Sequence, residues 1–471
     1  MLVLVSMVAF TSCDNDDDGD PDTPDTSNVI TDDGSGTGTT TWTADKEWIL
    51  DGFVFVNSGQ TLTIEAGTVI KGKPGQGADA SALIVARGGK LIANGTAANP
   101  IIFTAEEDDV NEPNDIPANT TGLWGGLIVL GNAPLNSDPG STQIEGIPET
   151  ETRGLYGGNA ANDNSGVFKY ISIRYGGTNI GAGNEINGFT LGGVGSGTEI
   201  DYVEVIFNAD DGIEFFGGNP NAKHLAVAFV GDDSFDYDEG YDGKGQFWFT
   251  VQNSTVAGGS DRCGEHDGGT SPETGEPFAT PEIYNATYIG RGAGEGKRTI
   301  TFRDNAGGTY ANSIFVEQDR GIDVEILGNG DNSYTQWQND RLMLMNNTFW
   351  NVAGNTEADI FRLTPAKYGT VNDDGTPNQT AIDDSTMQVN DAIADFAPYF
   401  ADANNQVFNP GINVGYTPGS NLNPVPANTV AAGAAVPSDG FFENVNYSGA
   451  FGNTNWLKGW SLLDQMGYLA D

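Results

Sequence analysis

A repeat of 22 residues in the middle of the chain constrains its fold more than any other feature. The segment 200–205 aligns with 222–227, and the acidic segment 210–215 aligns with 232–237. One turn of a solenoid with three short strands per turn has about this length, and its turns stack on one another. We therefore expect a continuous buried column in which these pairs are stacked: Val203 on Leu225, Val205 on Val227, Ile213 on Phe235, and Phe215 on Tyr237.

The remaining sequence repeats short apolar segments separated by glycine and asparagine, without helical segments between them. This pattern excludes a doubly wound sheet and favours an all-β fold, a right-handed single-stranded parallel β-helix over residues 42–471. Residues 390–471 are expected to form a small helical and aromatic cap, with Ile393, Phe396 and Phe400 on one helix face. An asparagine ladder is predicted at Asn253, Asn285, Asn312 and Asn346.

The N-terminus has the pattern of an export signal. An apolar segment, Leu2 to Phe10, is too short to span a bilayer and is followed by small residues and Cys13. This order resembles a bacterial lipobox, and the acidic residues after it resemble the surface-export signal of Bacteroidetes lipoproteins. The resemblance implies a signal peptide at 1–13, lipid on Cys13, and attachment to the outer membrane at the cell surface. Residues 14–41 are expected to be a disordered acidic tether, which leaves Cys263 without a disulfide partner.

The charge of the chain restricts its partners. The sequence has 65 acidic and 20 basic residues, a net charge of −45. Such a surface repels nucleic acid, so a nucleic-acid partner is excluded. It attracts divalent cations, and an acidic polysaccharide can approach it only where calcium bridges the two.

An acidic cluster is the strongest candidate site. Stacked coils place Asp210 and Asp211 about 4.8 Å from Asp232 and Asp233, and carboxylates this close cannot all stay ionised without a cation. Calcium accepts many oxygen ligands in irregular geometry, so a structural calcium ion is expected. The alternative is that these aspartates only cap tight turns. The candidate ligands are Asp210, Asp211, Asp232, Asp233, Asp236, Asp238 and Asp242.

Several sequence motifs resemble those of Bacteroidetes surface lipoproteins with a pectate-lyase-like β-helix: Gly125–Pro134, Gly192–Thr198, Asp210–Gly218 and Gly449–Gly452. The spacing from Asp232 to Asp236 is similar to the calcium pocket of family-9 pectate lyases. That similarity implies Asp232, Asp233 and Asp236 as ligands, with Asp210 or Asp211. A lysine in that family removes the proton α to the uronate carboxylate, but neither Lys244 nor Lys297 has the matching strand context.

Other candidate residues are weaker. Three arginines and three aromatic residues could line a sugar-binding groove, although the arginines could instead form ion pairs between coils. Cys263 and His266 are predicted in a surface loop, and His224 is predicted to be a packed structural histidine opposite Tyr202. The groove residues are Arg291, Arg298, Arg303, Trp248, Tyr284 and Tyr288.

These patterns favour a non-catalytic cell-surface protein, stabilised by calcium, that binds glycan or another extracellular partner. A calcium-dependent polysaccharide lyase or glycoside hydrolase is the first alternative, and a structural adhesin or surface-layer component is the second. Parallel β-helices host all three functions, so the fold does not choose among them.

Overall fold

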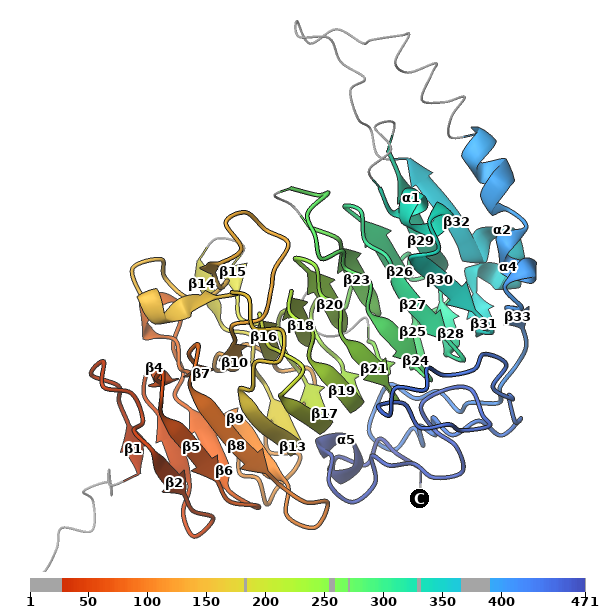
Figure 1. Ribbon diagram of the computed structural model, residues 1–471. Helices are drawn as coiled ribbons and strands as arrows, with labels where there is room; N and C mark the ends of the chain where they lie inside the picture. Colours follow the sequence, from red (N-terminus) through yellow and green to blue (C-terminus); the bar gives the residue numbers. More distant parts are fainter. Residues whose placement is uncertain are drawn as a thin grey trace, which may run out of the picture.

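The structure is a computed structural model that describes residues 28–181, 184–253, 259–269, 272–327, 332–365 and 390–470. Within these residues the chain winds into the predicted parallel β-helix, and its coils advance from the N-terminal to the C-terminal end of the molecule (Figure 1). None of the helices in this part of the chain has both the length and the apolar composition needed to cross a membrane.

Sheet B, with ten strands, forms one wall of the β-helix, and all its neighbouring strands are parallel. Successive coils contribute one strand each, so the strand order follows the chain. The strands are β4 (Phe53–Val56), β7 (Ala82–Val85), β10 (Leu127–Leu130), β16 (Phe189–Gly192), β18 (Ile213–Phe216), β20 (Phe235–Asp238), β23 (Gly264–Asp267), β26 (Arg298–Arg303), β29 (Arg320–Ile326) and β32 (Phe361–Pro365).

Sheet A contains two parallel ladders that form the other walls and share three long strands, β13 (Gly166–Arg174), β17 (Glu199–Ile206) and β19 (Asn221–Ala228). The first ladder also contains β2 (Thr40–Trp42), β5 (Thr61–Ile64), β8 (Lys90–Asn94), β21 (Lys244–Gln246), β24 (Glu282–Tyr284), β27 (Gly308–Ala311) and β30 (Leu342–Met345). The second contains β1 (Val29–Ile30), β3 (Trp48–Leu50), β6 (Val69–Gly72), β9 (Ile101–Ala105), β22 (Phe249–Val251), β25 (Thr287–Gly292), β28 (Ile314–Gln318), β31 (Thr348–Val352) and β33 (Gln406–Val407).

The interior confirms the predicted register. Val203 pairs with Leu225 and Val205 with Val227 across β17 and β19, and all four side chains are buried. The equivalent pairs on sheet B, Ile213 with Phe235 and Phe215 with Tyr237, are also in register and buried. The 22-residue repeat is therefore one coil of the β-helix.

The corner between the two ladders of sheet A consists of residues in left-handed backbone conformation. Tyr170, Tyr202 and His224 occupy it with φ of 47°, 57° and 46°, and their rings stack with centroids 4.3 and 4.1 Å apart. His224 is therefore the packed structural histidine that the repeat predicts. Stacking between successive rings stabilises a conformation that L-residues otherwise avoid.

In later coils asparagines replace these aromatic residues at the corner. Asn285, Asn312 and Asn346 have φ of 58°, 52° and 54°, which asparagine tolerates better than most residues. Their predicted ladder is wrong in detail. The amides of Asn285 and Asn312 donate to the carbonyls of Tyr447 and Ala434 rather than to each other, and Asn253 lies outside the series because it follows β22.

The N-terminal boundary differs from the prediction. Residues 29–30 and 40–42 form β1 and β2, which pair with β3 and β5. Trp42 is buried, and its ring stacks on Trp48 at 5.2 Å. The predicted tether therefore cannot extend to residue 41, because this segment already belongs to the first coil. The signal peptide, Cys13 and residues 14–27 lie outside the described residues.

The C-terminal region packs in two places. A helix at 390–396 and α4 (Tyr399–Asp402) cover the last coil, where Phe396 and Phe400 are buried against Phe361. Ile393 is instead 45% exposed, so it does not share their buried face. The chain then runs back along the side of the β-helix to α5 (Leu462–Gln465), which lies beside β17 and β19 (Figure 1).

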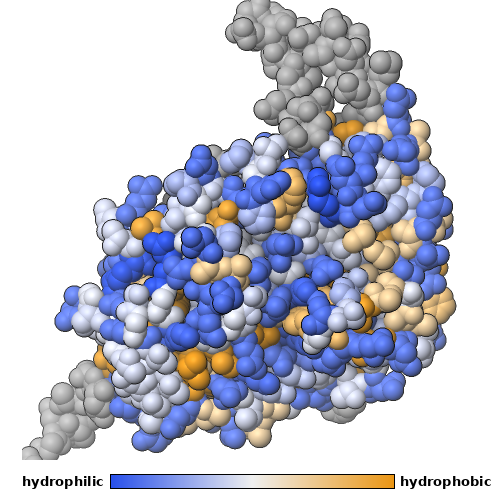
Figure 2. Space-filling view, viewed as in Figure 1, coloured by the Kyte–Doolittle hydropathy of each residue, from blue (hydrophilic) through white to orange (hydrophobic). Residues whose placement is uncertain are grey.

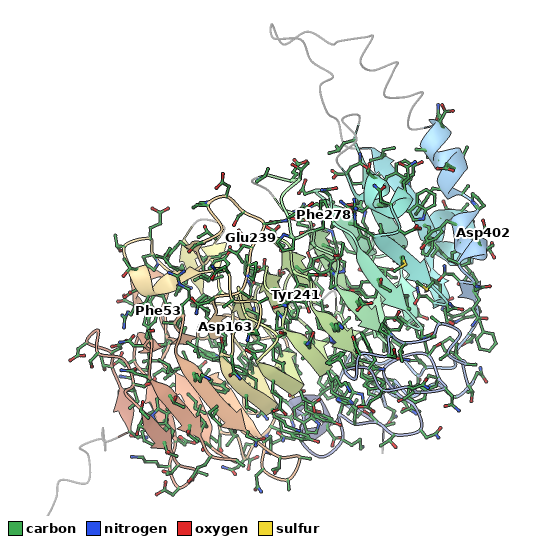
Figure 3. All side chains as sticks on the ribbon, in the orientation of Figure 1. Phe53, Asp163, Glu239, Tyr241, Phe278 and Asp402 are labelled. Atoms are coloured by element: carbon green, nitrogen blue, oxygen red, sulfur yellow. The ribbon has the colours of Figure 1, made fainter. Side chains whose placement is uncertain are left out.

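The remaining elements are short. The helices are α1 (Ser333–Gln338), α2 (Glu357–Ile360), η1 (Gly77–Asp79), η2 (Thr152–Gly154) and η3 (Ala353–Asn355), and the two hairpins pair β11 (Thr142–Gln143) with β12 (Leu155–Tyr156) and β14 (Asn179–Gly181) with β15 (Asn184–Glu185). An insertion at 131–165 carries β11, η2 and β12 across the outer face of sheet B. Glu239, labelled in Figure 3, follows β20, and its carboxylate accepts a hydrogen bond from Tyr156 of this insertion at 2.6 Å.

Candidate metal centre on the outer face of sheet B

Side chains alternate between the interior and the outer face along each strand of sheet B. One outward position is apolar or neutral in β10 and β16, where Ile128 and Thr190 occupy it. In the next three coils the same position is acidic, with Glu214, Asp236 and Glu265 in register on β18, β20 and β23. The fold therefore places a row of carboxylates on successive strands, about 4.8 Å apart.

The turns that precede β18 and β20 add four more carboxylates. Asp210, Asp211 and Asp232 form one group in which ligand oxygens lie within 4.8 Å of one another. Asp211 also belongs to a second group with Glu214 and Asp236, and Asp232 belongs to a third with Asp233 and Asp261. Shared members join the three groups into one cluster, which we call the acidic cluster; it comprises Asp210, Asp211, Glu214, Asp232, Asp233, Asp236 and Asp261.

Two of these aspartates also cap turns, as the alternative interpretation predicts. Asp211 Oδ1 accepts a hydrogen bond from the backbone amide of Asp233 at 2.8 Å. Asp233 Oδ1 in turn accepts from the backbone amide of Arg262 in the next coil. The cap on Asp211 leaves its Oδ2 available, so capping and cation binding are compatible there, whereas Oδ2 of Asp233 accepts a hydrogen bond from Arg262 at 3.0 Å.

Basic residues border the acidic cluster at one end. The Arg262 guanidinium lies 3.0 Å from Asp233 and 2.8 Å from Glu265. Lys297 Nζ lies 2.9 Å from Asp261 Oδ1. The group of Asp211, Glu214 and Asp236 makes no ion pair with a basic side chain in the described part of the chain.

Burial is the main cause of the raised pKa values of the carboxyl groups in the acidic cluster. It raises the pKa of Asp211, Asp236 and Glu214 well above the ordinary range of a carboxyl group, and neighbouring carboxylates raise these pKa values further. Burial also raises the pKa of Asp233, and that of Asp238 to about 7. A bound cation would remove this penalty by neutralising the carboxylates.

The donor set fits a hard divalent cation. All ligand atoms in the acidic cluster are carboxylate oxygens, which calcium prefers. Asp236 Oδ1 is buried and has no hydrogen-bond partner among the described residues. A buried oxygen without a partner costs free energy unless a cation or water satisfies it. The residues present therefore fit a calcium ion at Asp211, Glu214 and Asp236.

Comparison with known proteins identifies the family of the chain. Residues 34–390 match the family described as "Pectate-lyase like beta helix domain". The chain belongs to this family. Among solved structures, the catalytic domain of a GH87 alpha-1,3-glucanase in complex with tetrasaccharides is 10% identical, with 76% of this chain and 68% of that chain covered and a TM-score of 0.21. A likeness of that degree carries no functional argument, and no curated protein matches the chain.

The pectate-lyase-like β-helix brings five of the seven predicted ligands together. Asp238 and Asp242 lie outside the acidic cluster: Asp238 is at a different outward position of β20, and Asp242 accepts a hydrogen bond from Thr280 at 3.1 Å. The sequence analysis missed Glu214 and Asp261. Glu214 aligns with Asp236 in the repeat, so the repeat could have identified it as a ligand. Asp261 follows an insertion and has no counterpart in the repeat that could have identified it.

The predicted aromatic groove is wrong. Trp248, Tyr284 and Tyr288 are 0%, 5% and 1% exposed, because all three belong to the β-helix core or pack under the C-terminal segment. Figure 2 shows a mostly hydrophilic face in this view, with scattered hydrophobic residues. Stacking of sugars on these three aromatic residues is therefore excluded.

The arginines of the predicted groove follow the alternative interpretation, in which they pair with acids of neighbouring coils. Arg303 on β26 binds Asp267 on β23, with Nη2 and Oδ2 2.7 Å apart, and Arg298 pairs with Asp323 on β29. Arg291 donates to the carbonyl of Ser260 at 2.7 Å. These interactions tie coils together.

The predicted surface loop around His266 is also wrong. Residues 264–267 form β23, and His266 is fully buried with its ring stacked on Tyr237 at 3.9 Å. Burial lowers the pKa of His266 to about 3, and its Nε2 lies 2.9 Å from the Tyr310 hydroxyl. Cys263, three residues earlier in the chain, is a buried free thiol. His266 therefore packs as a neutral aromatic ring, with both ring nitrogens in hydrogen bonds.

Proposed function

We propose that this protein binds acidic polysaccharide at the cell surface through calcium ions, without cleaving it, and that lipid on Cys13 attaches it to the outer membrane. The observation that carries the proposal is the register of Glu214, Asp236 and Glu265 on adjacent strands, beside the aspartates of the preceding turns. A calcium ion held by a few protein carboxylates keeps coordination positions for other oxygen ligands. A carboxylate of the polysaccharide is the ligand that such an ion would accept.

At the acidic cluster, the charge of the chain supports an acidic partner only when calcium is present. With a net charge of −45, the protein repels polyanions at long range. Calcium reverses this locally because each ion neutralises two carboxylates. Since the predicted aromatic platform is buried, recognition of neutral sugars by stacking has no support at this site.

The test is calorimetric titration of the protein with polygalacturonate and with a neutral glucan, in calcium and in EDTA. We expect calcium to strengthen binding of polygalacturonate above the level seen in EDTA, and Asp236→Asn to lose this calcium-dependent increase. The matched control is Asp45→Asn, which removes one carboxylate far from the acidic cluster and should bind like the wild type. Equal binding in EDTA and calcium would contradict the proposal.

A second function, calcium-dependent polysaccharide lyase, is favoured by one observation. Lys297 pairs with Asp261 at 2.9 Å, so a lysine borders the acidic cluster after all. In a β-elimination, Lys297 would first have to lose its own proton and its pairing with Asp261. It would then take the proton α to the uronate carboxylate, a C4–C5 double bond would form, and the C4–O glycosidic bond would break, with the leaving oxygen taking a proton from water. Calcium would supply charge neutralisation of the substrate carboxylate.

The same samples decide between binding and catalysis. Growth of ultraviolet absorbance from the unsaturated product, abolished in Lys297→Gln and retained in Lys90→Gln, would establish the lyase. New reducing ends without that absorbance would indicate a glycoside hydrolase. Binding without either product would support the non-catalytic function.

A further inference from the structure

A second polar pocket lies far from the acidic cluster, in the first coils. Its volume is about 670 Å³, within the range of small-molecule sites. One wall consists of the corners that follow β4, β7 and β10, and the other is the insertion at 131–165. Its lining residues are Asn57, Ser58, Ala86, Arg87, Asn132, Thr152, Arg153 and Leu155.

The two arginines of this pocket differ in their electrostatic state. The charge of Arg153 is more than compensated, because it binds two carboxylates: Glu151 through two nitrogens at 2.8 and 2.6 Å, and Asp32 at 2.7 Å. Arg87 makes no ion pair with any carboxylate of the described residues. Its Nη1 donates to Ser141 Oγ at 3.1 Å and to the Gly157 carbonyl at 2.9 Å, both neutral acceptors.

These two hydrogen bonds hold the Arg87 side chain by one nitrogen. The Nε and Nη2 groups have no hydrogen-bond acceptor among the described residues and are not buried. Together they form the edge of a guanidinium that binds a carboxylate or sulfate through two parallel hydrogen bonds. A fixed, uncompensated cation in a chain of net charge −45 is therefore suited to an anion.

The other groups of the pocket are suited to a sugar. The hydroxyls of Ser58 and Thr152 line it, and neither forms a hydrogen bond with another described side chain. Ala86 and Leu155 add apolar surface that can contact the ring carbons. We propose that this pocket binds a sugar that carries one oxyanion, a uronate carboxylate or a sulfate ester, with Arg87 as the anion-binding residue. This site acts independently of calcium.

The test is titration, in EDTA, with three oligosaccharides of equal length: an oligogalacturonate, a sulfated oligosaccharide and a neutral one. EDTA removes the contribution of the acidic cluster, so failure here is distinguishable from failure of the proposed function. We expect the wild type to bind one or both anionic probes but not the neutral probe. Which anionic probe binds distinguishes the carboxylate from the sulfate.

Variants locate the site. Arg87→Gln should weaken binding at least tenfold, and Arg87→Lys should also weaken it because an ammonium cannot form the two parallel bonds. Lys90→Gln, a matched loss of positive charge nearby, and Asp236→Asn should bind like the wild type. Ser58→Ala should weaken binding without changing the melting temperature. This second variant tests the pocket even if the Arg87 variants do not fold. Equal affinity in wild type and Arg87→Gln, equal affinity for the neutral probe, or no binding of any probe would overturn the proposal.

Discussion

Asp211 Oδ1 accepts a hydrogen bond from the backbone amide of Asp233, 22 residues later, at 2.8 Å. This bond links one coil to the next at the point where the acidic cluster begins. The same aspartate lies within ligand distance of Glu214 and Asp236. Asp211 therefore has two roles, a structural hydrogen bond and a share in a buried negative charge, and substitutions can separate them.

The first prediction concerns these two roles. Asp211→Asn keeps the acceptor oxygen but removes a buried charge, so in EDTA at pH 8 it should leave stability unchanged or raise it by about 1 kcal/mol. Asp211→Ala leaves the amide of Asp233 without a partner and should lower stability by about 1 to 3 kcal/mol. Urea denaturation of both variants measures the difference. Equal destabilisation by Asn and Ala would contradict the prediction, because the acceptor oxygen that Asn retains would then contribute nothing to stability.

The second prediction concerns pH. Burial raises the pKa of Glu325 to about 7 from its ordinary value of 4.5. A carboxyl with a raised pKa in the folded state favours folding when protonated, so its contribution is complete below pH 4.5 and is lost as the pH rises through 7. Glu325→Gln should remove this dependence and be more stable than the wild type at pH 8, by about 1 kcal/mol after allowing for partial solvation.

The measurement is the melting temperature of the wild type and of Glu325→Gln between pH 5 and pH 8. The two curves should lie close together at pH 5, separate as the pH rises towards 7, and stay a constant distance apart above that pH. Glu107→Gln is the control, because its side chain is exposed and makes no ion pair among the described residues, so removal of that charge should shift melting little. Parallel curves for the Glu325 variant and the wild type would contradict the prediction.

The third prediction concerns the C-terminal segment. The carboxylate of Glu204 accepts hydrogen bonds from the amides of Leu462 and Leu463, at 2.8 and 3.1 Å, at the start of α5. Arg174, fully buried nearby, supplies the compensating charge. Glu204→Ala should cost about 3 to 5 kcal/mol, because it leaves a buried cation and two amides unsatisfied.

Limited proteolysis measures this effect directly. Glu204→Ala should release fragments cut after residue 403 faster than the wild type does. Glu443→Ala is the control: Glu443 also joins the C-terminal segment to the β-helix, through Lys223 at 3.0 Å, but its side chain is 56% exposed. That variant should be cut at the wild-type rate. Equally fast cutting of both variants would contradict the prediction, because the buried carboxylate would then hold the C-terminal segment no more strongly than the exposed one.

The sequence predicted what the repeat encodes. Val203 on Leu225 followed from a 22-residue interval, and the same interval located Asp211 beside Asp233. The prediction failed where insertions break the interval. Strand β23 follows such an insertion, so His266 could not be assigned to the interior, where a neutral histidine ring packs as an aromatic residue does. The prediction for Trp248 failed for a related reason: the sequence around it does not indicate whether its side chain points into the β-helix or towards solvent, and in the structure it is buried.

The central claim is that carboxylates from successive coils hold a divalent cation. The most direct measurement is an anomalous difference map from crystals grown with calcium and soaked in terbium, which replaces calcium at oxygen sites. The predicted result is a peak within coordination distance of Asp211, Glu214 and Asp236 that is absent from crystals of Asp236→Asn. A wild-type map with no peak at these residues, at a terbium concentration that labels other carboxylates, would contradict the claim.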